Sequence, residues 1–122
     1  MVEVIYPKEG LANLLGNLLL QNTKRDRKKA EIARKTRGTV VIEVRDLGFS
    51  ATVEFKGDKI EVRNGKPEGL SDYALISANF GVISYLLGNN STINSLKLML
   101  SGKLKIRKIM LAKKLSTIMS TH

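Results

Sequence analysis

Apolar residues near the start of the chain recur with the period of a helix. Leucines stand at positions 11, 14, 15, 18 and 19, which is the spacing of one helical stripe. Pro7 precedes the stripe, as is typical of a helix entrance, and Asn13, Gly16 and Asn17 fall on the opposite side. Residues 23–38 are highly charged and end at Gly38. The pattern predicts an amphipathic helix followed by a solvated helix or a connector.

The middle of the chain changes to the alternation of strands. Apolar and polar residues alternate in 39–45, 49–56 and 59–64, and the short connections "DLG" and "GD" separate these runs. We therefore expect an antiparallel meander with one apolar face and one wet face. A fourth strand is expected near residues 72–77.

The last third returns to helical spacing around one more strand. Helices are predicted at 78–88, 91–100 and about 108–119, with a fifth strand at 102–107. The predicted class is α+β: a single five-stranded, largely antiparallel sheet covered on one face by helices. The 122 residues suit one domain, with a helical part at 1–37 and the sheet with its covering helices at 38–119.

The composition argues against several kinds of chemistry. The chain has no cysteine and a single histidine, His122, so neither a disulfide nor a thiolate or histidine-cluster metal site is expected. It contains no nucleotide-binding glycine motif and no nucleophile elbow, and most of its acids fall on wet strand faces or in turns. We expect no cofactor, no metal and no enzymatic activity. The chain shows no targeting segment, so a cytoplasmic location is expected.

The net charge of +10 is unevenly distributed. Residues 73–122 carry basic residues and no acid, and residues 24–37 form a second basic segment. This asymmetry is compatible with nucleic acid, with an anionic membrane, or with ordinary solvated surfaces. Nucleic acid is the less favoured partner, because aromatic residues are only 5% of the chain and do not alternate with the basic ones.

Three segments occur in an order that resembles a known family. They are "ATVEFKGDKIEV" (51–62), "SDYALISANFGVISYLLG" (71–88) and "LMLSGKLKIRKIMLAKKL" (98–115). The chain is similar here to the sterol-carrier-protein type-2 family of lipid-transfer domains, over about residues 38–119. The most specific piece is "SGKLKI" before "LAKKL". Arg107 and Lys108 depart from the pattern, because the family usually has a glycine and a small polar residue there.

The resemblance implies an apolar tunnel between sheet and helices for a sterol, a fatty acyl chain or a similar lipid. The implied lining residues are Phe80, Ile83, Leu87, Leu98, Met99, Leu100, Met110, Leu111, Leu115 and Met119. Lys108, Lys113 and Lys114 would then face water or an anionic membrane. The alternative is a structural or protein-interaction module with a filled core, for which the Leu11–Leu19 stripe offers a homodimer surface.

Overall fold

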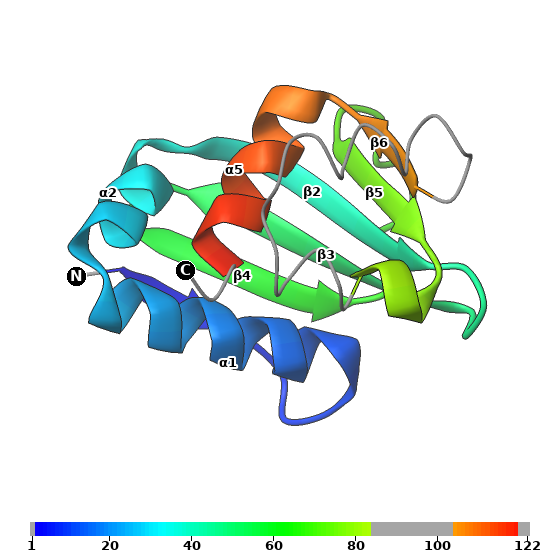
Figure 1. Cartoon of the computed structure of the whole chain (residues 1–122), viewed down its shortest axis with the longest axis horizontal. Helices are drawn as coiled ribbons and strands as arrows, with labels where there is room; N and C mark the ends of the chain where they lie inside the picture. Colours follow the sequence, from blue (N-terminus) through cyan, green and yellow to red (C-terminus); the bar gives the residue numbers. More distant parts are fainter. Residues whose placement is uncertain (1, 84–103, 120–122) are drawn as a thin grey trace.

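The computed structural model describes residues 2–83 and 104–119, and every structural statement below concerns these residues. Its strands are β1 (Glu3–Ile5), β2 (Arg37–Val44), β3 (Phe49–Lys56), β4 (Lys59–Asn64), β5 (Ala74–Ala78) and β6 (Leu104–Arg107). The helices are α1 (Gly10–Arg25), α2 (Arg27–Lys35) and α5 (Ile109–Met119). All three helices lie on one side of the sheet (Figure 1). The predicted α+β class is confirmed.

The sheet has six strands in the order β1-β4-β3-β2-β5-β6, one more than the five predicted. The additional strand is β1, whose three residues pair in parallel with β4 at the edge of the sheet. Pairing of β2 with β5 is also parallel, and the three other pairings are antiparallel. The sheet is therefore mixed, because the chain crosses from β4 at one side of the central pair to β5 at the other.

The core lies between the sheet and the helices, as the alternation of the strands predicts. The strand side chains of this core come from positions of one phase, among them Val40, Ile42, Val44, Ala51, Val53, Phe55, Ile60 and Val62. Facing them, the helices bury Leu15, Leu19, Ala30, Ala33, Leu115 and Ile118. Val41 and Thr52, at positions of the other phase, are buried as well but do not belong to this core. Full burial of each large aliphatic side chain stabilises the fold by roughly 1.5–3 kcal/mol.

The leucine stripe of α1 faces this core only in part. Leu15 and Leu19 are buried and Leu11 and Leu18 are half-buried, whereas Leu14 is 63% exposed. The homodimer expected through this stripe stays a prediction. The placement of Gly16 on the side opposite the stripe was wrong: Gly16 is buried together with Ala12, Leu15 and Leu19 and lies against the side chain of Tyr6. Glycine has no side chain, so hydropathy gives no signal of its burial.

The charged segment after the stripe forms a second helix. The carboxylate of Asp26 accepts hydrogen bonds from the backbone N–H groups of Lys28 (2.9 Å) and Lys29 (3.3 Å). Such a cap satisfies amide groups that have no partner in the first turn of a helix. It starts α2 directly after α1 and brings Ala30 and Ala33 into the core. No helix in the described parts of the chain is long and apolar enough to cross a membrane.

Candidate functional site

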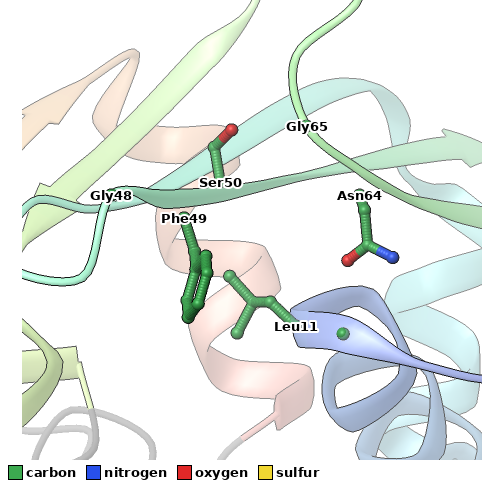
Figure 2. Close-up of a pocket in the computed structure, with 7 residues that line it drawn as sticks. Leu11, Gly48, Phe49, Ser50, Asn64 and Gly65 are labelled. Carbon is green, nitrogen blue, oxygen red and sulfur yellow. The ribbon is translucent and has the colours of Figure 1, made fainter.

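A pocket of about 390 Å³ lies where α1 begins, β3 begins and β4 ends (Figure 2). Leu11 and Phe49 form its apolar walls, and their side chains point toward one another (Figure 2). The remaining lining residues have small or polar side chains: Gly10, Gly48, Ser50, Asn64 and Gly65. No ionisable side chain lines this pocket, so it offers an apolar ligand a neutral surface.

Phe49 is the unusual residue of this pocket. It has the same strand phase as Ala51, Val53 and Phe55 and therefore lies on the helix-covered face of the sheet. Phe55 is 2% exposed, but Phe49 is 58% exposed. An aromatic side chain on the core-facing side of the sheet thus keeps more than half of its surface accessible. Alternation predicts the face of Phe49, but exposure depends on where the helices end over the sheet.

Asn64 fixes the opposite wall of the pocket by capping α1. Its Oδ1 accepts a hydrogen bond from the backbone N–H of Ala12 (2.9 Å), and its Nδ2 donates one to the carbonyl oxygen of Glu9 (3.0 Å). The cap residue Glu9 makes no side-chain cap bond itself, so β4 supplies the cap from a distant part of the sequence. Gly10 has a φ of +80°, and a Cβ there would lie 2.6 Å from Asn64 Oδ1. Glycine is therefore required where α1 meets β4.

The turn between β2 and β3 joins this end of the sheet to the helical residues 80–83. Asp46 Oδ1 accepts a hydrogen bond from the backbone N–H of Phe80 (2.9 Å), and Arg45 N–H donates one to Ala78 O (2.9 Å). Phe80 is 46% exposed and Leu47 is 49% exposed. Exposed apolar side chains therefore flank the Asp46 contact, Leu47 on the turn and Phe80 on the helical residues.

The predicted lining residues lie in three different surroundings. Ile83, Leu115 and Met119 are buried in the core and Leu111 is half-buried against it. Phe80 and Met110 are exposed, and Met110 keeps 72% of its surface. Leu87, Leu98, Met99 and Leu100 lie outside the described residues. The structure thus brings Leu111, Leu115 and Met119 together on the inner side of α5. That the predicted residues line a tunnel stays a prediction.

Arg107 and Lys108, which depart from the family pattern, connect β6 to α5. Lys108 has a φ of 56°, in the left-handed region that favours glycine, and its ammonium group pairs with Asp72. Lys108, Lys113 and Lys114 are all exposed. Their contact with a membrane stays a prediction at this point.

A charged cluster occupies the other face of the sheet. Glu61 pairs with Arg63 at 2.7 Å and with Lys56 at 3.1 Å. The hydrogen bonds from Arg63 and Lys56 lower the pKa of Glu61 to about 2, and the same contact with Glu61 raises the pKa of Lys56. Hydrogen bonding to Lys66 likewise lowers the pKa of Tyr73. Glu61, Arg63 and Lys56 belong to an ion-pair network on the sheet surface away from the pocket. Among the described residues, no group of three or more His, Cys, Asp or Glu side chains could hold a metal ion.

The sequence matches the family model of the SCP-2 sterol transfer family over residues 17–120. Three solved structures show the fold. A structure titled UbiJ-SCP2, a ubiquinone synthesis protein, is 21% identical with a TM-score of 0.62, and the match covers 85% of this chain and 90% of that one. The apo form of sterol carrier protein 2 from Yarrowia lipolytica is 20% identical with a TM-score of 0.62 and 88% coverage of both chains.

The third structure is the sterol carrier protein domain 2 of Helicoverpa armigera. It is 18% identical with a TM-score of 0.58, and the match covers 84% of this chain and 82% of that one. No curated protein sequence matches the chain. At these identities the likeness to the solved structures shows the fold alone. The match to the family model is a match of the amino-acid sequence, and it spans residues 17–120.

Proposed function

The chain belongs to the SCP-2 sterol transfer family, and we propose that it is a non-enzymatic domain that binds and transfers an apolar lipid such as a sterol or a fatty acyl chain. One observation carries the proposal: the accessible pocket between Leu11 and Phe49, on the helix-covered face of the sheet. An exposed aromatic at this position is stabilised when an apolar partner covers it, because apolar surface then leaves water.

The dimensions and polarity of the pocket agree with such a ligand. Its volume of about 390 Å³ falls in the range of about 300–1,000 Å³ that is typical of small-molecule sites. Each methylene group of a ligand that leaves water contributes about 0.8 kcal/mol. The amide of Asn64 is already bonded to Glu9 and Ala12, and Ser50 lies on the opposite phase of β3 and points away from Phe49 (Figure 2). Selection would therefore depend on apolar area rather than on a polar headgroup.

We assign Leu11 and Phe49 to the entrance and the predicted residues of α5 to the deeper contacts. Leu111, Leu115 and Met119 follow one another at intervals of four residues on the inner side of that helix. Leu115 and Met119 are almost fully buried, so a ligand that reaches them has to separate α5 from the sheet. The thioether of Met119 is flexible enough to repack around an inserted chain.

The chain has no tryptophan, which allows a direct test. Phe49→Trp places a single reporter in the pocket, and Leu47→Trp places one two residues earlier, in the turn before β3, at a residue that does not line the pocket. Titration of delipidated Phe49→Trp protein with a fatty acid should give a saturable blue shift of the emission, with a much smaller shift for Leu47→Trp.

A second titration keeps the natural sequence. An environment-sensitive fluorescent fatty acid should bind the wild-type protein with the same affinity at low and high salt, and an unlabelled fatty acid or a sterol should displace it. Absence of saturable binding in the wild-type protein would reject the proposal. Equal shifts at positions 47 and 49 would reject the assignment of the entrance while leaving lipid binding itself intact.

A further inference from the structure

We propose that the outward side of α2 and α5 is a docking surface for an anionic lipid bilayer. The charges of the protein are sorted by layer. Helices α1, α2 and α5 contain nine lysines and arginines and a single acid, Glu31. The acids of the strands occur on the opposite side of the molecule, where Glu54 and Glu61 lie on the outer face of the sheet.

The exposed cations of this layer form what we term the basic helical face. Its members are Lys24, Arg25, Arg27, Lys28, Arg34, Lys35, Lys113 and Lys114. Helices α2 and α5 contact each other and lie on the same side of the sheet (Figure 1). Cations that are separated by some eighty residues in the sequence are therefore presented by neighbouring helices.

Burial orients both helices so that the cations point outward. On α2, Arg27 and Lys28 recur two turns later as Arg34 and Lys35, and Ala30 and Ala33 face the core. On α5, Lys113 and Lys114 stand three and four residues after Met110, on the side opposite Ala112, Leu115 and Met119. Each helix is held by its apolar side, which leaves the basic side free to meet a partner.

The cations of the basic helical face are not neutralised within the described part of the chain. The ion pairs there join strand residues such as Lys56 and Glu61, or join Lys108 to Asp72. None of them involves a member of the basic helical face. Glu31 and Asp26 are the only acids in the segments that carry these eight cations, so the face keeps a large positive charge, which attracts an anionic surface.

Met110 favours a bilayer over a nucleic acid as that surface. Its side chain is 72% exposed and stands beside Lys113 and Lys114 on the outward side of α5. An apolar residue among lysines suits the boundary between headgroups and acyl chains, where both kinds of group are satisfied. Helices α1, α2 and α5 carry no aromatic residue on which bases could stack. The inference rests on the proposed function, because it names the membrane from which a lipid carrier would load and unload.

The test is flotation of the full chain with vesicles of phosphatidylcholine alone and of phosphatidylcholine with phosphatidylserine. Wild-type protein should bind only the vesicles that contain phosphatidylserine, and less so as salt rises. The double variant Lys113→Gln, Lys114→Gln should bind them about 30-fold more weakly, since each cation near an anionic leaflet contributes about 1 kcal/mol. Met110→Ser should weaken binding by a factor that does not depend on salt.

A charge-matched control separates this face from net charge. Lys59→Gln, Lys66→Gln removes the same two charges from the outer face of the sheet and from the loop that follows β4. It should leave vesicle binding nearly unchanged. Equal losses in the two double variants would overturn the proposal, and so would absence of binding to phosphatidylserine vesicles. Tighter binding to a single-stranded RNA oligonucleotide than to these vesicles would also overturn it.

Binding of the fluorescent fatty acid in solution distinguishes the two proposals. The Lys113→Gln, Lys114→Gln variant should bind the fatty acid as the wild-type protein does, because both residues point away from the core. If the wild-type protein binds the fatty acid but not the vesicles, only the proposed docking surface is rejected. If the wild-type protein does not bind the fatty acid, the proposed function is rejected, whether or not the protein binds the vesicles.

Discussion

Replacement of Gly16 with alanine should destabilise the protein, although glycine is normally the weaker residue inside a helix. A Cβ at position 16 would lie 2.2 Å from Cγ and 2.4 Å from Cβ of Tyr6. Real side chains do not approach so closely, and the atoms concerned are the base of the Tyr6 side chain rather than a flexible tip. The tyrosine would have to move, and with it the hydrogen bond that its hydroxyl donates to Asn17 Oδ1 at 2.9 Å.

The expected magnitude follows from three opposing contributions. Alanine gains about 1 kcal/mol over glycine in helix propensity. Overpacking against Tyr6 costs about 2 kcal/mol, and loss of the hydrogen bond to Asn17 costs about 1 kcal/mol more. The net loss is about 2 kcal/mol, which for a chain of this size lowers the melting temperature by roughly 8 °C.

Thermal and urea unfolding followed by circular dichroism would measure this loss. Gln21→Ala is the control, because Gln21 is exposed on the same helix and its replacement should change stability by less than about 0.5 kcal/mol. In a Tyr6→Gly background both the ring and the Cβ of residue 6 are absent, so Gly16→Ala should become stabilising by up to about 1 kcal/mol. The reasoning is refuted if Gly16→Ala stabilises the wild-type protein, or if its effect is the same with and without Tyr6.

Three further predictions concern the helix, its cap and the charged face. Leu15→Ala should lower the free energy of unfolding in urea by about 2–5 kcal/mol, because Leu15 is 2% exposed. Leu14→Ala should lower it by less than about 0.5 kcal/mol, and equal losses would contradict the orientation of α1. Asn64→Ala should lower the free energy of unfolding by about 1–2 kcal/mol through loss of the α1 cap. Asn64→Asp keeps the acceptor oxygen and should lose less stability than Asn64→Ala; an equal loss in the two variants would contradict the capping role. Because Arg63 and Lys56 lower the pKa of Glu61 from 4.5 to about 2, the stability that Glu61 contributes is present above pH 4.5 and is lost as pH falls toward 2. Urea unfolding from pH 6 to pH 2.5 should show a smaller decline in Glu61→Gln, and an identical decline would contradict the pairing.

Strands with one buried and one wet face could be read directly from the sequence. The predicted bounds of the strands at 49–56 and 59–64 coincide with those of β3 and β4, because every second residue there faces the core. The three residues of β1 are too few to show any period. Its parallel pairing with β4 depends on a chain that returns to the sheet edge, which no local pattern encodes.

The site was less predictable because it depends on contacts between distant parts of the chain. The inner stripe of α5 follows from its period, and Leu111, Leu115 and Met119 do lie on the inner side. Met110 is one residue before Leu111 and therefore turns outward with Lys113, which helical spacing alone could have indicated. The exposure of Phe49 could not be foreseen, because it is decided by where α1 begins over the sheet. That position is set in turn by a cap from Asn64.

The pocket and the basic helical face are formed by different elements. Variants of the two sites should therefore affect different steps of lipid transfer between vesicles. The pocket draws on the start of α1, β3 and β4, whereas the basic helical face draws on α2, α5 and the end of α1. Phe49→Ala should therefore weaken ligand binding and leave vesicle docking unchanged, and Lys113→Gln with Lys114→Gln should do the reverse. Transfer of a labelled lipid between phosphatidylserine vesicles requires both steps, so both variants should slow it. Between neutral vesicles, where no anionic surface is there for the lysines to meet, the double lysine variant should transfer the lipid at the wild-type rate, and only the Phe49 variant should be slower than the wild-type protein.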